Sequence, residues 1–123
     1  MNLRDYYLKI ESLLSEFSLI TQFSVNFEEI TDFIGYIKGK FELINGSIIY
    51  FFEFVEIQNN IPVRVKYKYQ WQSPEGNLIK RCNNAPHHKE IETFPDHVHD
   101  PDGVFPSRTI SLESILDNQL DFE

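Results

Sequence analysis

Three short turn signals divide residues 35–83 into runs along which apolar and polar side chains alternate. The signals are Asn-Gly at 45–46, Asn-Asn at 59–60 and Ser-Pro-Glu-Gly-Asn at 73–77. Gly and Asn tolerate the positive φ of tight turns, and Pro presets the φ that opens one. Because parallel strands need a crossover of a dozen or more residues, connections this short predict antiparallel neighbours. The chain is therefore expected to form a meander.

Five strands are predicted, at residues 19–27, 35–44, 47–57, 62–72 and 78–83. The fourth has the clearest alternation, with Val63, Val65, Tyr67, Tyr69 and Trp71 on one face and Arg64, Lys66, Lys68, Gln70 and Gln72 on the other. The second places Ile37, Phe41 and Leu43 opposite to Tyr36, Lys38, Lys40 and Glu42. The third is aromatic on both faces, which is typical of a strand in the middle of a sheet.

Helices are predicted at both ends of the chain. Apolar side chains recur at three- and four-residue steps over residues 2–17, and Ser111 is a good N-cap for a short helix over 112–120. Between the sheet and this last helix, residues 84–108 contain four prolines and show no periodicity, which predicts a long loop. The predicted fold class is α+β: an N-terminal helix, a five-stranded antiparallel meander sheet, a long loop rich in His and Pro, and a short C-terminal helix, in one domain over residues 1–123.

The charge and cysteine content restrict the function classes. A net charge of −8 argues against generic nucleic-acid binding, yet residues 62–89 hold six basic residues against one acid, a local +5. Such a basic face is either a binding surface or merely solvated. Cys82 is the single cysteine, so no disulfide can form within the chain, and we expect it to fill a small buried position. Without a signal peptide or a membrane-spanning run, a cytoplasmic protein is expected.

All four histidines, His87, His88, His97 and His99, lie within thirteen residues. One interpretation is metal binding, because His97 and His99 would point to one side of an extended segment and could chelate a divalent ion such as zinc. A second is general acid–base chemistry on RNA without a cofactor, since two histidines can exchange protons near neutral pH. A third is structural, in which each histidine only satisfies hydrogen bonds.

The RNA hypothesis also needs groups that bind the substrate. The cation that stabilises the phosphate would be Arg81, Lys80 or Lys68. Bases would stack on the rings of Tyr69, Trp71 and Phe94. The residue types are complete for this chemistry, whereas their geometry is not readable from the sequence.

Several segments resemble the TumE family, whose members are toxins of two-gene toxin–antitoxin modules. They are Tyr-Lys-Tyr-Gln-Trp-Gln at 67–72, Gly-Asn-Leu-Ile at 76–79, Arg-Cys-Asn-Asn-Ala-Pro-His-His at 81–88 and Thr-Phe-Pro-Asp-His-Val-His at 93–99. The family pattern runs Tyr-x-Tyr-His-x-Gln, then Arg-Trp/Tyr-Asp-Asn-Ala-Pro-His-His, then Thr-Phe-Pro-His-His-Lys-His. The signature therefore covers residues 67–99, and the Ser-Leu-Glu start of the last helix at 111–113 also fits.

The resemblance implies nuclease activity, a small helix-turn-helix antitoxin as partner, and a set of candidate site residues: Arg81, Asn84, His87, His88, His97 and His99. The sequence departs from the pattern at four positions, with Gln70 and Asp96 where His is common, Asn83 where Asp is usual and Val98 where Lys is common.

The leading hypothesis is a ribonuclease-like toxin with His88 and either His97 or His99 as the acid–base pair, Arg81 on the phosphate and Asn84 positioning the loop. The alternative is a non-catalytic or metal-binding family member that acts through protein contacts. In either case a homodimer is conceivable, because an aromatic sheet face could pair with a second copy.

Overall fold

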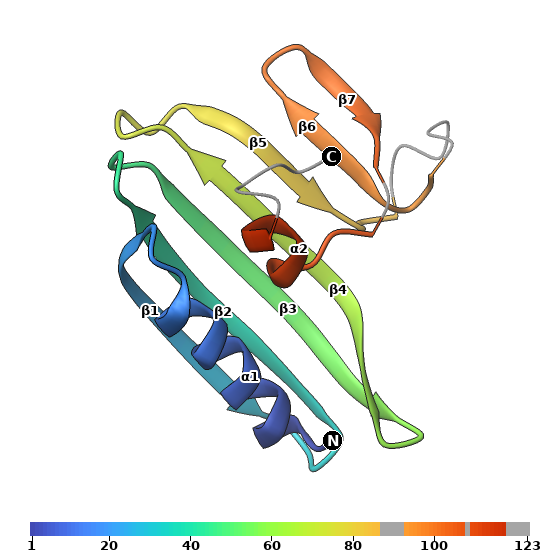
Figure 1. The fold of residues 1–123 in the computed structure, drawn as a ribbon. Helices are drawn as coiled ribbons and strands as arrows, with labels where there is room; N and C mark the ends of the chain where they lie inside the picture. Colours follow the sequence, from blue (N-terminus) through green and yellow to red (C-terminus); the bar gives the residue numbers. More distant parts are fainter. Residues whose placement is uncertain (87–92, 108, 118–123) are drawn as a thin grey trace.

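The computed structural model describes residues 1–86, 93–107 and 109–117, which form a seven-stranded antiparallel sheet with two helices on one of its faces (Figure 1). The elements are α1 (Leu3–Glu16), β1 (Ile20–Glu29), β2 (Ile34–Leu43), β3 (Ile48–Gln58), β4 (Ile61–Gln72), β5 (Leu78–Asn83), β6 (His97–Asp100), β7 (Gly103–Pro106) and α2 (Leu112–Asp117). The strands follow one another across the sheet in chain order, so the predicted α+β meander is confirmed.

Local chemistry explains where α1 begins and how the hairpins turn. Asn2 Oδ1 accepts a hydrogen bond from Asp5 N at 2.8 Å, and the Asp5 carboxylate accepts one from Asn2 N at 3.2 Å, which is a capping box. Asn59 and Asn60 take φ of 52° and 63°, as a two-residue hairpin turn with positive φ requires. Gly46 takes φ of 86° in the preceding hairpin. The predicted N-terminal helix and turns are therefore confirmed.

One prediction about β4 is wrong, because a β-bulge interrupts its alternation. Phe54 pairs with Lys66 and Val55 with Arg64, which leaves Val65 as an extra residue that is 39% exposed. One inserted residue moves each side chain beyond it to the opposite face of the sheet from the one that strict alternation predicts. Arg64 consequently lies on the same face as Tyr67 and Tyr69, on the side of the helices, instead of beside Lys66 and Lys68.

The expected number of strands is also wrong. The segment 84–108, predicted as a loop, contains β6 and β7, which pair with each other and extend the sheet beyond β5. Proline does not prevent this, because Pro101 lies in the turn between the two strands and Pro106 ends the outermost strand. His97 and His99 therefore belong to a strand, and their orientation is set by its register.

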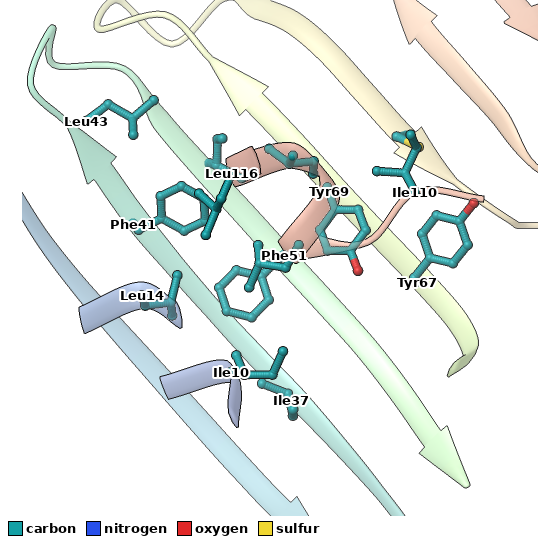
Figure 2. Close-up of a cluster of buried hydrophobic side chains, with 14 of the residues drawn as sticks. Ile10, Leu14, Ile37, Phe41, Leu43, Phe51, Tyr67, Tyr69, Ile110 and Leu116 are labelled. Atoms are coloured by element: carbon teal, nitrogen blue, oxygen red, sulfur yellow. The ribbon is translucent and has the colours of Figure 1, made fainter. Parts of the chain in front are cut away.

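The hydrophobic core lies between the helices and the sheet, where Ile10 and Leu14 of α1 and Leu116 of α2 meet side chains of β2 to β4 (Figure 2). A buried polar cluster crosses this core. Glu53, which is 1% exposed, accepts hydrogen bonds from the hydroxyls of Tyr6 and, at 2.5 Å, Tyr69. Arg64 Nη1 donates to the Tyr69 hydroxyl oxygen at 2.8 Å and to the Ile110 carbonyl at 2.5 Å. These four side chains, called the Glu53 network below, connect α1, β3, β4 and the segment leading to α2.

Because α1 and α2 lie on the same face of the sheet, neither covers the opposite face, which we call the outer face (Figure 1). Cross-strand partners share a face, so the register assigns Lys38, Tyr50, Lys68 and Arg81 to it. In the part of the chain that the structure describes, no helix is long and apolar enough to cross a membrane.

Candidate functional site

The pairing of β5 with β6 brings four polar residues of the signature together on the outer face. Arg81 pairs with His99, and Asn83 pairs with His97. Partners in an antiparallel ladder point to the same side with Cβ atoms about 4.5–5.5 Å apart. The sequence places His99 eighteen positions after Arg81, and only the ladder makes them neighbours.

Two adjoining hollows lie on this face. One, of about 420 Å³, is called the Arg81 hollow; its lining includes Lys66, Lys68, Arg81, Asn83, Asn84, Pro86 and His99. The other, of about 320 Å³, is called the Tyr50 hollow; its lining includes Lys38, Tyr50, Gln70 and Gln72. Phe52 and Lys68 line both, so the two hollows are continuous along the sheet.

The two described histidines have different environments. His97 is 1% exposed, and its Nδ1 lies 2.8 Å from the carbonyl oxygen of Pro95. A carbonyl can only accept, so Nδ1 carries the proton and this bond sets the orientation of the ring. The His99 ring is half-buried and meets His97 edge-on, with 4.8 Å between centroids and 68° between planes. His99 can therefore reach a ligand in the Arg81 hollow, whereas His97 packs behind it.

Arg81 is the cation nearest to His99 in the ladder. Its side chain is half-buried, and within the described part of the chain no hydrogen-bond acceptor reaches its buried Nε. A guanidinium is a planar fork of donors that suits phosphate oxygens. Arg81 is therefore well placed for an anionic group in the hollow that it lines.

Asn84 holds the rim of the Arg81 hollow to the bulged part of β4. Its Oδ1 accepts a hydrogen bond from Tyr67 N at 2.9 Å, and its Nδ2 donates to the Val65 carbonyl at 3.1 Å. These backbone groups lie beyond the last paired residue of β5, so the amide side chain continues the ladder by one step. The role of Asn84 in positioning the loop stays a prediction.

Four other residues predicted to bind substrate lie elsewhere. Tyr69 is 0% exposed and belongs to the Glu53 network, so its ring cannot stack on a base. Trp71 packs against the core, and Lys80 is its cross-strand partner on that same face. Phe94 is exposed in the turn before β6 and does not line the Arg81 hollow. Of the residues predicted to bind substrate, Lys68 and Asn84 line the Arg81 hollow.

His87 and His88 lie outside the described residues. Among the residues that are described, no group of three or more His, Cys, Asp or Glu side chains could hold a metal ion. Cys82 is fully buried, as predicted, and burial raises the pKa of its thiol to about 12. A thiol that stays protonated in the core is a poor nucleophile.

The departures from the family pattern do not all touch this site. Val98 pairs with Cys82 and packs in the core, so the lysine common there in the family would lie away from the outer face. Asp96 accepts hydrogen bonds from the hydroxyls of Tyr67 and, at 3.2 Å, Thr109, which ties the turn before β6 to β4 and the segment before α2. Gln70 and Asn83 remain on the outer face beside Arg81 and Lys68.

Sequence reasoning missed the contribution of the central strands to this surface. Lys38, Tyr50 and Phe52 line the Tyr50 hollow, and Lys40 pairs with Tyr50. The alternation of the second strand had already placed Lys38 and Lys40 opposite to the core. What it lacked was the register that sets them in line with Lys68 and Arg81.

Comparison with known proteins identifies a family. The sequence model of the family described as Toxin TumE matches residues 10–123, nearly the whole chain. No curated protein and no solved structure matches.

Proposed function

Because the chain belongs to the TumE toxin family, we propose that it is a ribonuclease that acts at the Arg81 hollow without a metal ion. The observation that carries this proposal is the pairing of His99 with Arg81 across the β5–β6 ladder at the edge of that hollow. An imidazole can move protons near neutral pH, and a guanidinium beside it can stabilise a phosphate whose charge increases.

The chemistry assigns one task to each group. A base removes the proton of the 2′-hydroxyl, whose oxygen attacks phosphorus; the bond from phosphorus to the 5′-oxygen breaks, and an acid protonates that oxygen. His99 takes one of these two proton-transfer roles, and Arg81 binds the non-bridging oxygens. His97 positions the His99 ring through their edge contact. The second acid–base group is supplied by His88 or His87, which follow the hollow-lining Pro86 directly in the sequence.

The test is cleavage of labelled RNA by purified protein in the presence of EDTA, together with growth of a bacterial host after induced expression. Since a general acid or base contributes about 10²- to 10⁴-fold, His99→Ala should lower the cleavage rate by at least roughly 100-fold and abolish growth arrest. Arg81→Ala should do the same, whereas Arg4→Ala, an exposed arginine of α1, should leave both unchanged. An equally toxic His99→Ala variant, or RNA left intact by the parent protein, would refute the assignment.

Toxins of this kind are controlled by a partner, and we propose a helix-turn-helix antitoxin encoded beside this chain and acting with it in the cytoplasm. Co-expression of that neighbour should relieve growth arrest and yield a complex on size-exclusion chromatography. If the protein encoded beside this chain neither binds it nor relieves toxicity, the proposed antitoxin is refuted. The ribonuclease assignment is tested separately by the cleavage assay.

A further inference from the structure

Side chains on the outer face form two straight rows across five strands. The register aligns His99, Arg81, Gln70, Tyr50 and Lys40 in the first row, and His97, Asn83, Lys68, Phe52 and Lys38 in the second. Each row runs from the β6 edge of the candidate site through an aromatic ring of β3 to a lysine of β2. With strands about 4.8 Å apart, four steps extend over roughly 19 Å.

The rows concentrate positive charge in an acidic protein. Lys38, Lys40, Lys68 and Arg81 stand in them, no Asp or Glu does, and Lys66 lines the same hollow as Lys68. Five of the chain's eleven lysines and arginines therefore lie on this face, although the net charge is −8. The four lysines are exposed. A cationic stripe without interspersed carboxylates attracts the phosphates of a nucleic-acid strand.

The aromatic residues stand in the middle of the rows. Tyr50 is 40% exposed, and Phe52 lies between the two hollows and lines both. The Phe52 ring stacks on Tyr36 with centroids 5.8 Å apart, which supports it from the β2 side. The register places both residues on the outer face, and both helices lie on the other face of the sheet (Figure 1). Aromatic rings exposed between cations are the usual platform for unpaired bases.

From this arrangement we propose that the outer face is a binding track for single-stranded RNA, which crosses the strands from β2 to β6. Lys38, Lys40 and Lys68 bind phosphates, and Tyr50 and Phe52 stack on bases. The length of the rows suits about four nucleotides, the lower end of the range for compact single-strand-binding folds. Because stacking needs free base faces, a duplex does not fit. The proposal rests on the proposed function in that the track leads the strand to Arg81 and His99.

The experiment measures binding apart from cleavage. A fluorescent RNA of about eight nucleotides with 2′-O-methyl groups has no 2′-hydroxyl nucleophile, so its anisotropy reports binding by the intact protein alone. Tyr50→Ala should weaken binding between about 5- and 150-fold, the range for one lost stacking contact. Lys38→Ala/Lys40→Ala should make the slope of log K against log salt less steep by about 1.4, since each single-strand phosphate contact contributes about 0.7. Arg4→Ala/Lys9→Ala, which removes the same charge from α1, should keep the parent slope.

The outcomes separate this proposal from the proposed function. If the row variants bind as the parent does, or if the same strand binds equally well in a duplex, the track is overturned even where cleavage occurs. If the variants weaken only the complex with the antitoxin, the face belongs to a protein partner and the track is again overturned. If the protein binds the methylated strand through the rows but leaves ordinary RNA intact, the track stands and the ribonuclease assignment fails. Circular dichroism of each variant establishes that it is folded.

Discussion

The Glu53 network allows a stability prediction worked directly from its contacts. Glu53→Gln keeps the side-chain volume but leaves one acceptor oxygen where the carboxylate has two, each bound to a tyrosine hydroxyl. A hydrogen bond to a charged group contributes about 1.5–3 kcal/mol, so losing one sets the lower bound. Removing one member of a buried ionic pair costs about 3–5 kcal/mol. Arg64 contacts Glu53 through the Tyr69 hydroxyl and not directly, so the low end of this range applies. We therefore expect a loss of about 3 kcal/mol in the free energy of unfolding.

Urea unfolding monitored by tyrosine and tryptophan fluorescence measures this loss. Glu29→Gln, at an exposed position of β1, is the matched control and should change stability by less than about 0.5 kcal/mol. Tyr69→Phe and the double variant complete a cycle, whose coupling energy should exceed about 1 kcal/mol because the two side chains share a bond. A loss below about 1 kcal/mol for Glu53→Gln would show that the network is not a desolvated ionic cluster, and the reasoning would fail.

Three further predictions follow from single residues. Burial raises the pKa of the Cys82 thiol from 9.0 to about 12, so its contribution to stability is complete well below pH 9 and declines above pH 9 with a slope that approaches about 1.4 kcal/mol per pH unit. In urea curves at pH 8, 9 and 10 the parent should lose about 1.3 kcal/mol more than Cys82→Ala between pH 8 and pH 10, most of it above pH 9. A Cβ added at Gly39 would lie 2.7 Å from the Ser24 carbonyl oxygen and 2.8 Å from the Phe51 ring, so Gly39→Ala should lower the thermal midpoint, by about 1–3 kcal/mol in stability; an unchanged midpoint would contradict that close approach. Asn84→Ala removes two hydrogen bonds to β4 and should cost about 1–3 kcal/mol in urea unfolding while also slowing RNA cleavage; Asn77→Ala, at an exposed position of the turn before β5, is its control.

The parts of this fold that were predictable are those that local chemistry determines. The capping box at Asn2, the Asn59-Asn60 turn and the alternation of β2 each depend on residues close in the chain. The facing of Arg64 was not predictable in this way, because the bulge at Val65 is defined by pairing with β3. The short strands β6 and β7 were missed because four residues carry too little periodicity and prolines border them.

The same distinction explains what the sequence says about the candidate site. The cluster of histidines draws attention to this segment but treats the four as equivalent, whereas in the structure His97 is buried, with its Nδ1 bonded to the Pro95 carbonyl, and His99 is half-buried. The sequence also names Tyr69 and Trp71, together with Phe94, as base-stacking residues, because it shows their aromatic rings but not which face of the sheet they occupy. Which face of the sheet the helices cover is a property of the whole fold. Tyr69 and Trp71 lie on the covered face and pack in or against the core. Beside the candidate site, the outer face offers a base the rings of Tyr50 and Phe52, on the strand whose two aromatic faces had indicated only a central position in the sheet.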